Sequence, residues 1–345
     1  VSFKIMKLFY SQYAYYLRSL RKQNSFLLIS LFVILSCDAS ALEIYDLERG
    51  STVVGEIKNI TINYSESVPD IANRFKTGYQ DLLVANPNSH NWMPEINSKY
   101  VIPLMYILPQ KNYNGIILNL AELRLYYYMP PTDLYETAKV LTYPVGIGRL
   151  DWKTPLGETF IRYKVKNPDW YPPKSIITEH EENGEILPRI VKSGPNNPLG
   201  IYALKLNVPG GYLLHGTNKK YGIGMKVSHG CIRLRNEDIK TIFHNVSIGT
   251  KVKIVDLPIK LGTYKNFLYM EVHAFNNQEI YSNNQKNFLT TNNIYKPVTP
   301  VMEFIEDNPN YKINWGNVFK AYKESRGVPV IIGKKNFTNL NKNTF

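Results

Sequence analysis

Short apolar runs separated by turn residues recur along the middle of the chain and predict a protein rich in β-strands. Leu120 ends one such run and Leu123 begins the next, on either side of Ala121 and Glu122, which predicts a β-hairpin. A helix is expected from Asn236 as its N-cap. The predicted strands are Ile116–Leu120, Leu123–Tyr128, Val140–Val145, Ile201–Asn207 and Tyr212–His215, and the apolar helix face is Ile239, Ile242, Phe243 and Val246.

A smaller unit with a different pattern is expected at residues 55–104. Ile60–Tyr64 alternates like a strand, and Ser67 is placed to cap a helix that runs to Phe75. A second helix is predicted at Tyr79–Asn86, and Tyr100–Pro103 is predicted as a returning strand. The order is therefore strand, helix, helix, strand.

Two further regions complete the domain organisation. Residues 167–200 are rich in Pro, Asn and Gly and are predicted to form a long loop, of the kind that serves as a lid or a binding surface. Residues 265–345 are predicted to be an accessory segment of short α/β character. In it we expect a strand at Phe267–Val272, a helix at Val318–Ser325 and a mobile Asn-rich stretch at residues 276–293.

The N-terminus carries the pattern of a secretory signal peptide. Arg18, Arg21 and Lys22 precede the apolar run Phe26–Leu35, and the small residues Ala39–Ala41 follow. That run is shorter than the roughly 20 residues that a spanning helix needs. We therefore expect residues 1–41 to be cleaved and the mature protein to be periplasmic, with lipid anchoring at Cys37 as the alternative.

The charge of the chain favours an anionic partner without naming one. The net charge is +13, and removal of residues 1–41 takes away five basic residues and one acidic residue. The mature charge is then 36 − 27 = +9. We expect no nucleic-acid partner.

Candidate chemistry is concentrated around Cys231, the one cysteine that remains after cleavage. A lone thiol in an exported protein is inert, paired with another chain or chemically employed. A thiol nucleophile needs a base, which His215 at the end of a predicted strand can supply. Gly230 allows close approach of a substrate, and the N–H groups of Gly230 and Cys231 are candidates for an oxyanion hole.

The residues alone leave three alternatives to this assignment. His215, His229 and Cys231 could be zinc ligands, but no fourth-ligand spacing or glutamate base accompanies them. Cys231 could be a buried structural thiol, although Arg233 beside it is not typical of a core. His229 could be the base, an oxyanion donor or a scaffold, and the residues alone do not decide among these roles.

The stretch "HGT…SHGCIRLRNEDI" resembles the signature of the L,D-transpeptidase catalytic domain of the YkuD type. The resemblance extends through "LNLAELRLYYY", "YPVGIGR", "TPLG" and "GPNNPLGIYALKL", and the layout of the whole chain resembles the periplasmic ErfK/YbiS/YcfS/YnhG-like branch. "SVPDIANRF", "LLVANP" and "YVIP" resemble the LysM module, which binds cell-wall glycan. The alternative is that residues 55–104 form a small domain that only packs against the rest of the protein and does not bind sugar.

The resemblance implies a mainly β catalytic domain at 113–257 and a function in cell-wall organisation and cell shape. Cys231 would be the nucleophile, His215 the proton donor and acceptor, and His229 a supporting residue. The implied substrate-binding residues are Ser228, Gly230, Arg233, Gly216 and Thr217.

The implied reaction takes a peptidoglycan tetrapeptide stem, forms a thioester and releases D-Ala. The resemblance favours the C-terminal lysine of murein lipoprotein as the acceptor over the diaminopimelate of a second stem, which would give a 3-3 cross-link. It implies no metal or organic cofactor, and it implies acylation by carbapenems. Two alternatives are a hydrolase of the same fold, which trims stems or detaches lipoprotein, and a non-catalytic LysM-type wall-binding protein.

Overall fold

The computed structural model describes residues 44–131, 137–149, 154–274 and 291–336. The predicted signal peptide and Cys37 lie outside these described residues. Across the same ranges, no helix is both long and apolar enough to cross a bilayer.

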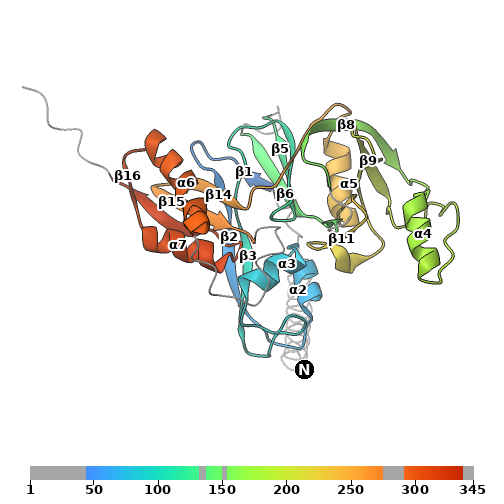
Figure 1. The fold of residues 1–345 in the computed structure, drawn as a ribbon, viewed down its shortest axis with the longest axis horizontal. Helices are drawn as coiled ribbons and strands as arrows, with labels where there is room; N and C mark the ends of the chain where they lie inside the picture. The colour runs from blue at the N-terminus through green and yellow to red at the C-terminus, as the bar shows by residue number, and fades with distance from the viewer. Residues whose placement is uncertain (1–43, 132–136, 150–153, 275–290, 337–345) are drawn as a thin grey trace, which may run out of the picture. The chain divides into compact units, whose positions relative to one another are not determined.

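A nine-stranded sheet runs through the predicted catalytic domain (Figure 1). Neighbouring strands are antiparallel, except that β4 is parallel to β13 and β10 is parallel to β12. The mainly β class predicted from the sequence is confirmed. The strands lie in the order β1 (Ile44–Asp46), β6 (Lys139–Pro144), β5 (Arg124–Met129), β4 (Gly115–Asn119), β13 (Lys251–Val255), β8 (Gly157–Lys166), β9 (Tyr202–Leu206), β10 (Leu213–His215) and β12 (Ile232–Arg233).

The predicted hairpin is the pair β4 and β5, in which Ile117 lies opposite Tyr126. Both strands are buried on both faces, which explains why their apolar runs are continuous. Side chains alternate along a strand, so Ile116 packs in the main core, whereas Ile117 packs with Tyr106 in a second cluster.

Helix α5 (Asn236–Asn245) lies beside β9 (Figure 1). Ile239 and Ile242 are fully buried in the main core, and the ring of Phe243 lies 4.6 Å from that of Tyr202. The predicted helix and its apolar face are confirmed. The predicted cap was wrong: the N-cap position is taken by Arg235, because the side chain of Asn236 bonds to a neighbouring loop instead.

The smaller unit has the predicted strand–helix–helix–strand order, in β2 (Val53–Thr61), α2 (Val68–Arg74), α3 (Tyr79–Ala85) and β3 (Lys99–Ile107). Ser67 caps α2 by accepting a 3.3 Å hydrogen bond from the Asp70 N–H, as predicted. The first strand was misplaced, since β2 ends at Thr61 and residues 62–64 follow it. This unit has its own core, and β2 and β3 pair along their whole lengths.

Buried arginine side chains are among the groups that join the smaller unit to the predicted catalytic domain. Arg124 Nη2 lies 2.8 Å from Asp81 Oδ2, and the Arg124 side chain is almost fully buried. Arg235 Nη2 donates to the carbonyls of Ala72 and Thr77 at 3.1 and 2.6 Å. The smaller unit is therefore held by two buried arginine side chains, one from β5 and one from the residue directly before α5.

The predicted loop at residues 167–200 contains a helix, α4 (Lys174–Glu182), so the expectation of a loop throughout this segment was wrong. Its base is closed by a bridge between Trp170 and Val191, whose N–H and carbonyl groups bond in both directions at 2.9 Å. Asn197 is fully buried and donates to the carbonyl of Pro168 at 2.9 Å. These bonds make the segment an ordered insertion rather than a flexible loop.

A second, four-stranded sheet follows in the order β14 (Ile259–Tyr264), β15 (Phe267–Val272), β17 (Val330–Lys335) and β16 (Tyr311–Ile313). The predicted strand at Phe267–Val272 is confirmed, and the predicted helix is α7 (Trp315–Glu324). Helix α6 (Thr291–Asp307) was not predicted, and it contains Pro297 and Pro300. Most of the predicted mobile stretch, 276–293, lies outside the described residues.

Candidate active site

Parallel pairing of β10 and β12 places His215 beside Arg233 and Leu214 beside Ile232. Leu214 and Ile232 are fully buried in the main core. Because side chains alternate, His215 and Arg233 project from the opposite face, and Cys231 directly precedes β12. The segments that carry the two candidate residues, sixteen positions apart in sequence, thus lie side by side.

The imidazole of His215 is buried and oriented by backbone carbonyls. Its Nδ1 lies 2.5 Å from Gly216 O, and because a carbonyl only accepts, Nδ1 donates the proton. Burial and the nearby charge of Arg233 lower the pKa of His215 to about 4. The neutral ring, protonated at Nδ1, therefore leaves Nε2 as the nitrogen able to accept a proton.

Cys231 is half-buried at the start of β12. Burial raises the pKa of its thiol, against the hydrogen bond with the backbone of Leu213 and the charges of Lys205 and Arg233, which lower it. Both reactive groups are uncharged near neutral pH. Lys205, on β9, was not among the candidates from sequence, because nothing local connects it to a cysteine 26 positions later.

The turn before Cys231 is held from two sides. Gly230 has a φ of 97°, a conformation that a residue with a Cβ rarely adopts. Its carbonyl accepts a 3.0 Å bond from Thr154 Oγ1, and the Cys231 carbonyl accepts a 2.5 Å bond from Ser228 Oγ. Fixing these carbonyls also fixes the direction of the neighbouring N–H groups.

The loop after His215 is clamped by Asn236. The Asn236 side chain accepts from the Thr217 N–H at 3.2 Å and donates to the Thr217 carbonyl at 2.9 Å. A Cβ on Gly216 would stand 2.1 Å from Asn236 Oδ1, so only glycine fits this position. Thr217 is buried and its hydroxyl accepts from the Lys219 N–H at 3.0 Å. Gly216 and Thr217 therefore lie in a loop, directly after His215, that is held by the Asn236 side chain.

His229 points to the insertion rather than to His215. Its Nε2 lies 2.8 Å from Glu179 Oε2 on α4, and the same oxygen lies 2.5 Å from Arg149 Nη2. Since a carboxylate only accepts, His229 Nε2 donates. The hydrogen bonds from Arg149 and His229 lower the pKa of Glu179 to about 2. Glu179 is 50 positions from His229, and no sequence motif indicated it.

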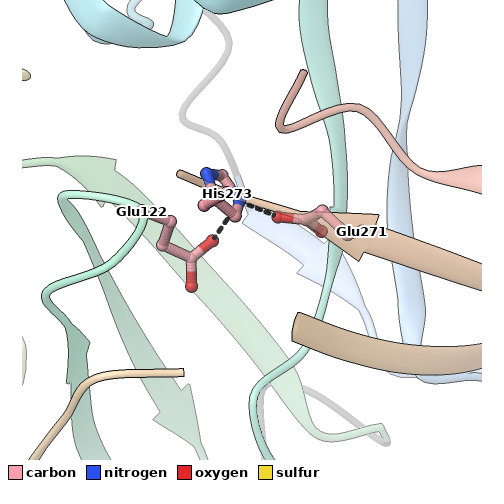
Figure 2. A group of neighbouring side chains, drawn as sticks. All are labelled: Glu122, Glu271 and His273. Carbon is pink, nitrogen blue, oxygen red and sulfur yellow. Dashed lines mark hydrogen bonds and ion pairs between the residues drawn. The ribbon is translucent and has the colours of Figure 1, made fainter. Parts of the chain in front are cut away.

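A second polar cluster is buried where β5, β14 and β15 meet. Figure 2 shows His273 lying between Glu122 and Glu271, with His273 Nε2 at 2.6 Å from Glu271 Oε1 and 3.9 Å from Glu122 Oε2. Within the described residues these three form a group with metal-ligand geometry, whereas His215, His229 and Cys231 do not.

A lysine occupies the place that a cation would take in this cluster. Lys260 Nζ lies 2.6 Å from Glu122 Oε2 and 3.0 Å from Glu271 Oε1. Burial acts to raise the pKa of Glu271, but the charge of Lys260 and the bond to His273 outweigh it and lower the pKa to about 2. Because the carboxylates already have an ammonium partner, we interpret the cluster as a structural joint, meaning a buried ion-pair cluster that connects parts of the fold.

Comparison with known proteins agrees with this architecture. Residues 113–254 match the model of YkuD, the L,D-transpeptidase catalytic domain. "Probable L,D-transpeptidase ErfK/SrfK" of Escherichia coli strain K12 is 34% identical over 311 residues, which cover 89% of this chain and 96% of that protein. "Probable L,D-transpeptidase YcfS" of the same strain is 44% identical over 229 residues, which cover 65% and 70%. The corresponding YbiS protein is 39% identical over 242 residues, covering 69% and 77%.

A solved structure of the catalytic domain of the Enterococcus faecium L,D-transpeptidase, acylated by ertapenem, is 18% identical to this chain. The match covers 41% of this chain and 98% of that domain, with a TM-score of 0.29.

The mainly β domain and the full-length relatives define an acyl-transferring enzyme. The chain belongs to the L,D-transpeptidase family.

Proposed function

We propose that this enzyme uses Cys231 to cleave peptidoglycan tetrapeptide stems and to transfer the resulting acyl group to an amine. The observation that carries the proposal is the pairing of β10 with β12, since His215 ends β10 and Cys231 directly precedes β12. The resemblance of the "SHGC" segment to the family signature supports the choice of Cys231.

In the acylation step, His215 Nε2 takes the proton of the Cys231 thiol while the sulfur attacks the carbonyl of the third stem residue. The carbon–nitrogen bond to D-Ala then breaks, and the protonated imidazole returns the proton to the departing amine. A thioester remains on Cys231. The N–H groups of Gly230 and Cys231 are proposed to stabilise the oxyanion, in a turn held by Thr154 and Ser228.

His215 rather than His229 is proposed as the base. His215 donates through Nδ1 to a carbonyl, which leaves its Nε2 able to accept. His229 donates through Nε2 to the Glu179 carboxylate. His229 therefore supports the turn from the side of the insertion.

In the second step an acceptor amine attacks the thioester, loses a proton to His215 and restores the thiol. We infer that the preferred acceptor is the C-terminal lysine side chain of murein lipoprotein, with the diaminopimelate amine of another stem as the second candidate. The branch resemblance supports this preference, since the likeness to ErfK/SrfK runs through 96% of that relative and so includes its non-catalytic parts. The energy of the cleaved peptide bond drives the reaction without a cofactor.

The setting proposed for the reaction is the periplasm, on the basis of the N-terminal pattern at residues 1–41. The unit from β2 to β3 is proposed as a LysM-like module that binds wall glycan, supported by its strand–helix–helix–strand order. Carbapenems are proposed as covalent inhibitors that mimic the stem.

Intact-mass spectrometry tests the acyl-enzyme. The mature protein is incubated with a carbapenem and, separately, with disaccharide tetrapeptide. We expect an adduct that maps to Cys231 and release of D-Ala, and Cys231→Ala should abolish both while leaving the fold intact. His215→Ala should slow acylation by roughly 10²–10⁴-fold, whereas a loss of only a few-fold would transfer the role to His229. A folded protein with a free thiol and no adduct would favour the wall-binding alternative.

Product analysis with added acceptors separates transfer from hydrolysis. A lipoprotein-bearing or cross-linked muropeptide identifies a transferase and its acceptor. A trimmed tripeptide as the sole product would contradict the transfer step and identify a hydrolase of the same fold.

A further inference from the structure

The Glu179 carboxylate on α4 is held by two donors that belong to the catalytic region. Glu179 Oε2 lies 2.5 Å from Arg149 Nη2 and 2.8 Å from His229 Nε2. A guanidinium together with an imidazole N–H is a donor set well suited to a carboxylate. The pair keeps Glu179 ionised, because its two hydrogen bonds lower the Glu179 pKa to about 2.

Both donors belong to segments that adjoin the turn before Cys231. His229 precedes Cys231 by two residues, and the Arg149 N–H donates to Ser228 O at 2.9 Å. Arg149 follows β7 (Ile147–Gly148), which pairs with β11 (Lys226–Ser228). The donor pair is thus fixed by strand pairing to the same turn that presents Cys231.

The helix that supplies Glu179 is only lightly packed. In α4, all of whose residues are described, Ile176 alone is buried. The side chains of Arg149 and Glu179 are 39% and 30% exposed. The base of the insertion is tied separately, through Trp170, Val191 and Asn197. Breaking the Glu179 contacts would therefore release α4 without unfolding the insertion.

We propose that Arg149 and His229 form a subsite for the terminal carboxylate of the donor stem, and that Glu179 occupies this subsite until substrate displaces it. The inference rests on the proposed function, in which the leaving residue is a D-Ala with a free carboxylate. That carboxylate belongs to the residue directly after the attacked carbonyl, so it must bind close to Cys231. The exchange replaces one carboxylate by another, so the donors remain paired before and after binding.

Opposite effects of two substitutions test this subsite. Arg149→Met removes a donor and is expected to raise KM for the tetrapeptide by about tenfold or more. Glu179→Gln removes the internal competitor and is expected to lower KM. Arg149→Lys keeps the charge and is expected to recover part of the loss. If the contacts only held α4 in place, Arg149→Met and Glu179→Gln would shift KM in the same direction. That result would overturn the proposed subsite.

The matched control is Asp169→Asn, which breaks the 2.9 Å contact of Asp169 with Lys192 elsewhere in the insertion. It is expected to leave KM unchanged. Thermal unfolding of each variant shows whether the protein is folded at the assay temperature.

Modified donors identify which carboxylate binds. A stem ending in D-alaninamide is expected to raise KM for the wild type but not for Arg149→Met. Sensitivity to amidation of diaminopimelate instead would overturn the assignment to the terminal carboxylate. A wild type that releases no D-Ala from any donor contradicts the proposed function, whereas an active wild type whose KM equals that of Arg149→Met contradicts only the subsite.

Discussion

Cys231 and His215 are both uncharged at rest, because each is removed from water. Burial raises the thiol pKa and lowers the imidazole pKa, to about 4. A resting thiolate–imidazolium pair is therefore disfavoured. Proton transfer is expected only as the sulfur attacks, which protects the Cys231 thiol from unspecific oxidation.

Arg233 acts on both groups in the directions that electrostatics requires. Its charge lowers the Cys231 pKa and lowers the His215 pKa. Arg233→Gln is expected to raise both pKa values and to slow alkylation of Cys231 by iodoacetamide several-fold at pH 8. The alkylation rate measured against pH checks this. Arg189→Gln, at an exposed position of the insertion, is the control and should not shift the profile.

The acylation rate is expected to fall only at an unusually low pH. The base must be neutral, and the His215 pKa of about 4 keeps it neutral through the range in which an exposed histidine, near 6.5, would already be protonated. The rate of carbapenem acylation should therefore hold between pH 7 and 5 and fall as the pH drops through about 4. The measurement is adduct formation by intact mass.

Folding needs a parallel check in that experiment. A histidine whose pKa is depressed by folding lowers stability as the pH falls from 6.5 toward 4. Circular dichroism at each pH separates loss of fold from loss of the base. A midpoint near 6.5 in a folded protein would contradict the assignment of His215.

At the scale of elements, α5 serves the site through its first residue as well as through its apolar face. Asn236 uses its side chain to hold both polar backbone groups of Thr217, and Gly216 must lack a Cβ to let it pass. The helix that covers the sheet is in this way coupled to the loop that follows His215.

This coupling predicts a non-additive pair of substitutions. Gly216→Ala drives its Cβ against Asn236 Oδ1, and Asn236→Ala leaves the Thr217 backbone groups without their partners, at a cost of about 1–3 kcal/mol. The double variant is expected to be more stable than the sum of the two losses allows, because Asn236→Ala removes the atom that is hit. Urea unfolding of the four proteins measures the coupling, and strict additivity would refute it.

Helix α4 shows the limit of reading elements from local pattern. It lies in the segment 167–200, which is rich in Pro, Asn and Gly, and these residue types predict a loop. The helix forms within an insertion that is closed at its base by the Trp170–Val191 bridge, a contact between residues 21 positions apart.

At the scale of the whole molecule, the buried cluster around Lys260 joins the catalytic sheet to the C-terminal sheet. Glu122 follows β4, whereas Lys260 and Glu271 lie on β14 and β15. Lys260 also donates to the carbonyl of Ile107, at the end of β3, at 2.7 Å. One ammonium group therefore contacts three regions of the chain.

Loss of that ammonium should be costly. Lys260→Met leaves two buried carboxylates without their cation, so we expect a loss of about 3–5 kcal/mol in the free energy of unfolding. The control is Lys253→Met, which removes a 3.9 Å contact to a largely exposed Glu158 and should cost about 0–1 kcal/mol. Chemical denaturation measures both, and equal losses would show that the cluster is not a joint.

Features that depend on neighbours in sequence could be read from the sequence. The β4–β5 hairpin, the apolar face of α5 and the Ser67 cap follow from side-chain periodicity and local hydrogen bonding. The candidate pair His215 and Cys231 was identified because its motif is short and its residue types are chemically specific. Family membership followed from the same segment, together with the order of motifs along the chain.

Only the tertiary structure decided which distant groups meet. Glu179 reaches His229 across 50 positions, and Lys260 reaches Glu122 across 138. Lys205 approaches Cys231 because β9 lies beside β10. Charged side chains carry no period that indicates their partner, so their pairing is determined by how strands are ordered and packed.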